Sequence, residues 1–124
     1  MHVTRAADAE TFELPGVRFT SLAAPRLGSA QICLWQLNVD AGLDTPQAHM
    51  LDCDEVFVVI EGRIRLTPEG AELKTGDAAV VPAGSPIQLA TTSDEPAVLH
   101  VAIQAGFSAT MADGTPVGNP PWAA

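Results

Sequence analysis

Short apolar runs separated by turn residues cover most of the chain. Residues 30–39 alternate, with Cys33, Trp35 and Leu37 on one face and Gln36 on the other. Alternation with a period of two residues is typical of a β-strand whose faces meet different environments. The segment therefore predicts a strand with one buried face.

Other runs repeat this pattern at intervals of about ten residues. Val56 to Ile60 is a continuous apolar run, as expected of a strand buried on both faces. Val17 to Leu22 could add a strand near the N-terminus. Further strands are expected within residues 63–66, 71–74, 78–81 and 96–103, with Pro- and Gly-containing turns between them. The pattern predicts an all-β fold, an antiparallel β-sandwich or small barrel.

The last segment, residues 106–124, differs in composition from the rest. It holds Pro116, Pro120 and Pro121, and a segment so rich in Pro and Gly is not expected to form a central strand. Trp122 is too large an apolar group to leave in water without a reason. We expect it to pack on the protein's own barrel or on a second subunit.

The composition of the chain argues against some classes of binding partner. The 124 residues suit one domain, and a net charge of -9 with only six basic residues argues against nucleic acid or an anionic membrane surface. No apolar run approaches the length of a membrane span, and the first residues lack a signal-peptide pattern. With only Cys33 and Cys53, the chain is expected to carry reduced thiols in the cytoplasm.

The segment 42–62 contains a spaced set of residues that indicates a particular family. Gly42, Glu55 and Gly62 keep the spacing of G-x5-H-x-H-x3–4-E-x6-G, with Ala48 and Met50 at the two histidine positions. This layout resembles the first conserved motif of the cupin family. Counting forward from Gly42 and back from Glu55 gives the same two positions, so the usual ligand pair is expected to be lost.

A second segment resembles the second cupin motif, G-x5-P-x-G-x2-H. Gly76, Pro82 and Gly84 match, and Ile87 stands at the final histidine position. The resemblance spans about residues 30–104. It implies one cupin domain over residues 1–124, a jelly-roll barrel with a cavity for a small-molecule ligand, and a homodimer.

Only Glu55 stands at a position where the resemblance implies a metal ligand. Without the imidazoles, we expect no metal cofactor and a lone carboxylate facing the cavity. Burial among apolar groups raises the pKa of a carboxyl, which suits proton transfer near neutral pH. The residues expected around the ligand are Gln47, Ala48, His49, Met50, Phe57 and Ile87. Of these, Ala48, Met50 and Ile87 are expected to wall the cavity beside Glu55.

A second alignment of the first motif would retain a metal site. If the loop before Glu55 has one extra residue, Gln47 and His49 replace the histidine pair of the motif. The ligands of an iron, zinc or manganese ion would then be Gln47, His49 and Glu55, with His100 as a further ligand. In the first register His49 points away from the cavity instead.

His100 lies in an alternating run near the end of the motif region. Val98, His100 and Ala102 share one face, and Leu99 and Val101 share the other. If the face with His100 lines the cavity, His100 is a catalytic partner of Glu55 or a metal ligand. If it does not, His100 is an ordinary core or interface residue.

Three functions follow from these alternatives. The first is a metal-independent isomerase or cyclase in which Glu55, with His100, transfers a proton. The second is a metal-dependent cupin enzyme of the isomerase, cyclase or dioxygenase type with the reduced ligand set. The third is a ligand-binding or sensory module without catalysis.

Overall fold

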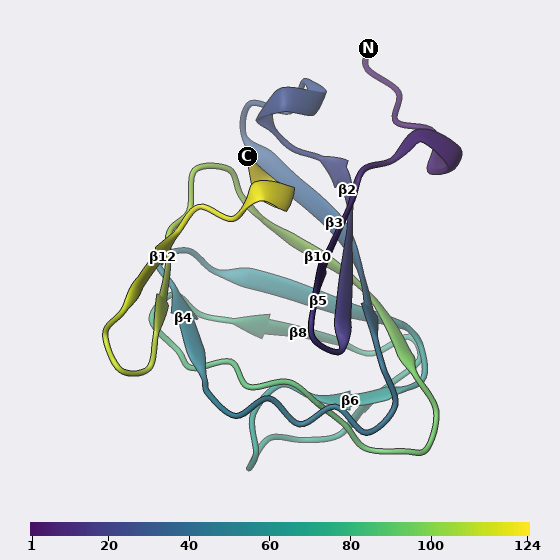
Figure 1. The fold of residues 1–124 in the computed structure, drawn as a ribbon, viewed down its shortest axis with the longest axis vertical. Coiled ribbons are helices and arrows are strands. Elements are labelled where there is room, and N and C mark those ends of the chain that lie inside the picture. The colour runs from purple at the N-terminus through teal and green to yellow at the C-terminus, as the bar shows by residue number, and fades with distance from the viewer.

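The alternating runs fold into antiparallel strands, and the computed structural model describes all of residues 1–124 (Figure 1). The strands are β1 (Thr11–Leu14), β2 (Val17–Ala23), β3 (Ile32–Val39), β4 (His49–Leu51), β5 (Glu55–Glu61), β6 (Arg63–Arg65), β7 (Leu73–Lys74), β8 (Ala78–Val81), β9 (Ala90–Thr91), β10 (Ala97–Gln104), β11 (Ala109–Met111) and β12 (Pro116–Gly118). Three short 3₁₀ turns are η1 (Ala6–Asp8), η2 (Pro25–Leu27) and η3 (Pro121–Ala123). None of the helical segments has the length and apolar composition that crossing a membrane requires.

One layer is a six-stranded sheet in the order β1-β2-β3-β10-β5-β8. Strand β10 lies at its centre and pairs antiparallel with β3 and with β5. The prediction of an all-β antiparallel fold is therefore confirmed, and the expected N-terminal strand is present as the hairpin β1–β2.

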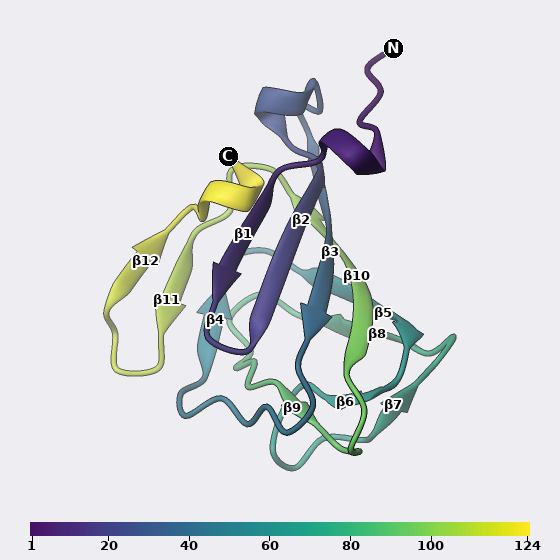
Figure 2. The same cartoon turned by 45° about the vertical axis from the view of Figure 1, so that its right-hand side comes forward.

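The second layer consists of two three-stranded sheets, β12-β11-β4 and β7-β6-β9. They face the large sheet, as the two views in Figures 1 and 2 show. Apolar side chains from both layers form one continuous core, which includes Leu51 and Ile64 from the small sheets and Leu37 and Leu99 from the large one. A cavity lies between the two layers of this sandwich.

Strand β5 buries every second side chain. Glu55, Phe57 and Val59 are buried and share the inner face, as the two-residue repeat of a strand requires. The expectation that the run is buried on both faces is wrong, because Val56 and Val58 are only half-buried and Ile60 is exposed. Their side of β5 is the outer face of the large sheet.

The expected homodimer stays a prediction.

Steric constraints explain why the first motif ends in a glycine. Gly62 has a φ of +81°, and a Cβ at this position would lie 2.5 Å from the carbonyl oxygen of Pro96. Only glycine adopts this backbone conformation without strain and leaves room for the neighbouring chain. Gly62 therefore allows β5 to turn sharply beside the start of β10.

The C-terminal segment enters the second layer. Strand β11 is the middle strand of β12-β11-β4, so the expectation that residues 106–124 form no central strand is wrong. The prolines all follow β11, and Pro116 lies on the edge strand β12, where a missing N–H is tolerated. The Pro and Gly content of the whole segment did not reveal that one short part of it, β11, can pair on both sides.

Trp122 packs on the barrel of its own chain. Its ring is stacked on Phe19, with centroids 3.7 Å apart and planes inclined by 12°. The surrounding backbone is held by Arg26 Nη1, which donates to the carbonyl oxygens of Pro121 (2.7 Å) and Ala124 (2.9 Å), and by Ser21 Oγ, which donates to that of Trp122 (2.8 Å). Because these contacts join positions about 100 residues apart in sequence, they close one end of the sandwich.

We predict that Trp122→Ala lowers the free energy of unfolding by about 2–3 kcal/mol, because it removes a half-buried aromatic ring that stacks on Phe19 and packs against the core. Urea denaturation followed by circular dichroism measures this change. The matched control is Pro121→Ala, since Pro121 is exposed and keeps the carbonyl that Arg26 binds. Equal stability of the two variants would contradict the prediction, since the Trp122 ring would then add no stability.

Candidate functional site

A cavity of about 480 Å³ lies between the large sheet and the sheet β12-β11-β4. Its wall is mainly apolar, and its polar side chains are few. It is lined by Leu14, Pro15, Val17, Phe19, Trp35, Leu37, Thr45, Pro46, Gln47, His49, Leu51, Glu55, Phe57, Ile87, Leu89, Ala109, Met111, Val117, Pro120 and Trp122. A concave apolar site with a few polar groups is the usual form of a small-molecule site.

Glu55 supplies the one carboxyl group of this wall. It is the first residue of β5, paired with Val81 of β8 and Ile103 of β10, and only 3% of it is exposed. Its carboxyl forms no hydrogen bond or ion pair within the protein. Burial raises the pKa of Glu55 from 4.5 to about 8, because an apolar environment disfavours the charged form. At neutral pH the group is therefore mainly protonated.

His49 reaches the same cavity from the opposite layer. It begins β4 and is held by paired backbone hydrogen bonds with Ile87, of 3.0 Å from its N–H and 2.8 Å to its carbonyl oxygen. Burial lowers the pKa of His49 below its ordinary value, because desolvation disfavours the imidazolium. Its ring is thus neutral at pH 7 and can accept a proton.

Strand β4 has the second of the two registers considered for it. Gln47, His49 and Leu51 face the cavity, whereas Ala48 and Met50 are absent from its lining. The expectation that Ala48 and Met50 wall the cavity is therefore wrong. A shift of one residue turns every side chain of a strand to the other face, and the loop 52–54 takes up the extra residue before Glu55.

His100 lies on the wrong face of β10 for a role in this cavity. Leu99, Val101 and Ile103 point into the core, while His100 is half-buried on the outer face of the large sheet. There its Nε2 lies 3.4 Å from Oε1 of Gln36 on the neighbouring strand β3. The suggestion that His100 assists Glu55 or binds a metal there is thus corrected, because the apolar side of β10 is the inner one.

Phe57 and Ile87 line the cavity, as the sequence suggested, and Gln47 lies at its exposed rim. Contact of any of these residues with a ligand remains a prediction. The aromatic side chains of Phe19, Trp35 and Trp122 also form the wall, and sequence analysis did not assign them to the site. Only the pairing of β2 with β3 and the docking of η3 bring these three rings together.

The side chains present do not fit the metal centre that cupin motifs imply. One imidazole (His49), one carboxylate (Glu55) and one amide (Gln47) share the cavity, while Ile87 occupies the place of a further histidine. No group of three or more His, Cys, Asp or Glu side chains is placed to hold an ion. An amide and an alkyl group are weak substitutes for two imidazoles.

The two cysteines are not part of the candidate site. Cys33 and Cys53 are free thiols, and neither lines the cavity. The thiol of Cys33 donates to the carbonyl oxygen of Ala123 at 3.3 Å. Burial, together with Asp52 and Asp54, raises the pKa of the Cys53 thiol, which disfavours the nucleophilic thiolate.

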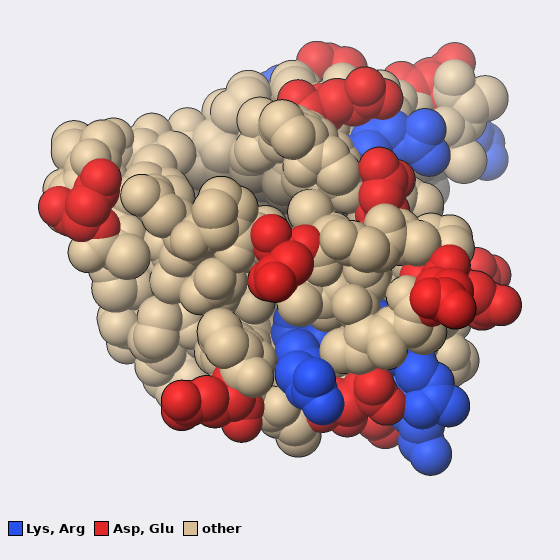
Figure 3. Space-filling model, turned by 60° about the horizontal axis from the view of Figure 1, so that its bottom comes forward, with Lys and Arg blue, Asp and Glu red and all other residues tan.

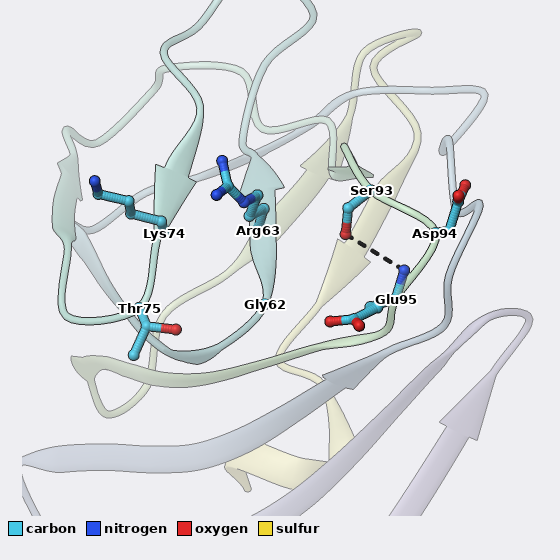
Figure 4. Close-up of a pocket in the computed structure, with 7 residues that line it drawn as sticks. All are labelled: Gly62, Arg63, Lys74, Thr75, Ser93, Asp94 and Glu95. Carbon is cyan, nitrogen blue, oxygen red and sulfur yellow. Dashed lines mark hydrogen bonds between the residues drawn. The ribbon is translucent and has the colours of Figure 1, made fainter.

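A second depression lies where β6 and β7 meet the loop before β10 (Figure 4). Its wall is entirely polar and carries charges of both signs, including Arg63, Lys74 and Glu95. Arg63 is already paired with Glu72 at 2.9 Å, and acidic and basic groups are interspersed over the face in Figure 3. None of the side chains that line this depression is buried, so the first cavity is the better candidate site.

The sequence matches the family described as "Cupin domain" over residues 35–103, more than half of the chain, and the protein belongs to this family. A comparison with curated proteins finds no match. Among solved structures, the polyketide cyclase RemF from Streptomyces resistomycificus is similar, with a TM-score of 0.73, 18% identity and coverage of 84% of this chain and 79% of that chain. A sugar phosphate isomerase of the cupin superfamily from Silicibacter pomeroyi has a TM-score of 0.66 and 23% identity over 88% of this chain and 80% of that one. KdgF from a Halomonas species has a TM-score of 0.63 and 17% identity over 80% and 89%.

We predict that Glu55→Gln stabilises the protein at pH 7 but not at pH 4.5. The pKa of Glu55 is about 8 in the folded protein and near 4.5 in the unfolded chain, so the folded state holds an extra proton between these values. Stability contributed by this carboxyl is present below pH 4.5 and falls as the pH rises towards 8. At pH 7 the expected gain on substitution is roughly 3 kcal/mol.

Denaturation of wild type and variant across this pH range measures the difference. Glu61→Gln is the matched control, because Glu61 ends the same strand and is exposed. A difference between Glu55→Gln and wild type that does not change with pH would contradict a raised pKa.

Proposed function

We propose that this cupin binds a small molecule between its two layers and transfers a proton next to a carbonyl group, as a metal-independent isomerase or cyclase. One observation carries the proposal: a buried carboxyl without a protein partner, Glu55, and a neutral imidazole, His49, line the same apolar cavity from opposite layers. A protonated acid and an unprotonated base are both needed to form an enol at neutral pH.

Each group has a defined role in this scheme. Glu55 donates its O–H to the carbonyl oxygen of the ligand, while a ring nitrogen of His49 accepts a proton from the adjacent carbon. The product is a neutral enol, an ionised Glu55 and a protonated His49. Return of a proton to a different carbon gives an isomer, and attack of the enol carbon on a second carbonyl closes a ring.

The similar structures include proteins described as a cyclase and an isomerase, and both reaction types proceed through such an intermediate. At 18% and 23% identity, they support the fold rather than the reaction. The proposed reaction therefore rests on the side chains in the cavity of this chain.

We predict that the protein accelerates hydrogen–deuterium exchange at the carbon next to the carbonyl of 2-tetralone, a small neutral ketone, in D₂O. Proton NMR follows the loss of this signal. Glu55→Gln and His49→Gln are expected to lower the rate above the buffer blank by about 100-fold, the usual contribution of a general acid or base. His100→Gln, on the outer face of the sheet, is the matched control and keeps the wild-type rate. A rate equal to the blank for all proteins would favour a binding module without catalysis.

The pH dependence separates the two possible assignments of acid and base. If Glu55 is the acid, the rate falls as the pH rises through about 8, since the proton is then lost. It also falls when the pH drops below the lowered pKa of His49, because the base is then protonated. A rate that rises through pH 8 would make Glu55 the base instead.

A metal-dependent enzyme is the second candidate, because Gln47, His49 and Glu55 do line one cavity. Elemental analysis of protein purified without a histidine tag tests it. We expect much less than one iron, zinc or manganese per chain, since the donor set is incomplete. Near-stoichiometric metal that is lost in His49→Ala would overturn the proposal and establish the reduced ligand set.

A further inference from the structure

The cavity contains no positively charged side chain. The six basic residues of the chain are Arg5, Arg18, Arg26, Arg63, Arg65 and Lys74, and none of them lines the wall. An anion that entered would give up its water without gaining a cation, which is costly in an apolar site. The net charge of -9 adds long-range repulsion.

The interior of the cavity favours a flat molecule. Phe57 and Trp35 lie on the large sheet and are almost fully buried, and Phe19 and Trp122 extend this aromatic wall towards the end of the sandwich. Aromatic rings pack best against other flat, polarisable groups. A volume of about 480 Å³ is compatible with two or three fused rings.

The polar side chains of the cavity differ in exposure. Glu55 is 3% exposed at the floor, His49 is half-buried, and Gln47 is exposed at the rim. Gln47, in the bend before β4, and His49, which begins β4, both line the cavity. The cavity therefore offers a ligand hydrogen-bonding side chains of graded exposure, together with the indole N–H groups of Trp35 and Trp122, which have no partner within the protein.

The rim itself presents two apolar side chains to water. Leu14, at the turn of β1–β2, and Val117, in β12, are each 52% exposed, and both line the cavity. They come from hairpins at opposite ends of the chain that flank the same opening. Exposed apolar groups at an entrance favour entry of an apolar molecule.

We propose that the cavity selects an uncharged, flat and mainly apolar molecule of two or three rings with a carbonyl oxygen at one edge, and rejects carboxylates and phosphates of the same size. The inference rests on the proposed function, because it names the substrate class for the same cavity. It excludes the class of phosphorylated sugars for this chain. A cationic amine paired with Glu55 is the rival occupant.

Three probes of nearly identical shape test the charge directly. They are 2-naphthamide, 2-naphthoate and 2-naphthamidine, which are neutral, anionic and cationic at pH 7. Isothermal titration calorimetry with the full chain measures each dissociation constant. We expect 2-naphthamide to bind at least about tenfold more tightly than 2-naphthoate, because the anion would lose its hydration without gaining a cation. Equal affinity for these two probes would overturn the inference, and so would tightest binding of the amidine that is lost in Glu55→Gln.

Intrinsic fluorescence reports where the probe binds. The chain has two tryptophans and no tyrosine, and both tryptophans line the cavity. Binding in the cavity is therefore expected to quench most of the emission. Saturable calorimetric binding without quenching would place the probe elsewhere and overturn the inference.

Variants at the rim test the apolar entrance. Leu14→Ser and Val117→Ser are expected to weaken binding of 2-naphthamide about three- to fivefold, as one small apolar contact is lost. Ile32→Ser and Val80→Ser are matched controls, because these residues are 58% and 64% exposed but lie outside the cavity. Equal losses in all four variants would contradict the assignment of the rim.

The results separate this inference from the proposed reaction. Tighter binding of 2-naphthamide than of 2-naphthoate, without hydrogen–deuterium exchange of 2-tetralone, would support the ligand class and overturn the catalytic proposal. Glu55-dependent exchange, with no preference for 2-naphthamide over 2-naphthoate, would retain the reaction and overturn the ligand class.

Discussion

The paired backbone hydrogen bonds between His49 and Ile87 fix the chemistry of the cavity. They hold β4 against the segment after β8 and, with the pairing of β4 and β11, set which residues of β4 face inward. A strand cannot turn one side chain without turning its neighbours, so this register brings His49 in and leaves Ala48 and Met50 out. The same bonds place the alkyl group of Ile87 where the cupin motif has a histidine.

The cavity combines an apolar wall with a carboxyl that the protein does not pair. Burying Glu55 in this way lowers stability at neutral pH, as its raised pKa indicates. A leucine or glutamine at this position would avoid the cost, so the carboxyl is best understood by what it can do for a ligand. The apolar and aromatic wall shields Glu55 from water, which is the cause of its raised pKa.

Closure of the sandwich depends on contacts between the two ends of the chain. Arg26 and Ser21 hold the backbone around Trp122, and Phe19 holds its ring. The hairpins β1–β2 and β11–β12 form the rim of the cavity for the same reason. The site is thus shaped by the ends of the chain, while its polar groups come from the cupin motifs.

Sequence alone determined much of the architecture. The alternation in residues 30–39 gave the inner face of β3, because period-two patterning is a local property of a strand, whereas the unbroken apolar run 56–60 left the exposed outer face of β5 unpredicted. Motif spacing gave the family and the loss of a histidine at Ile87, and composition disfavoured acidic partners. It also singled out Glu55, whose burial among apolar groups follows from its place on the inner face of β5.

Tertiary structure decided what local patterns could not. The loop 52–54 could hold one residue more or less without changing the motif anchors, so counting did not settle the register of β4. One face of β10 is wholly apolar and the other carries His100 and Gln104, and the packing of the two layers decided which of them faces the cavity. Phe19, Trp35 and Trp122 lie far apart in sequence, and no local signal joins residues that meet only when the sandwich closes.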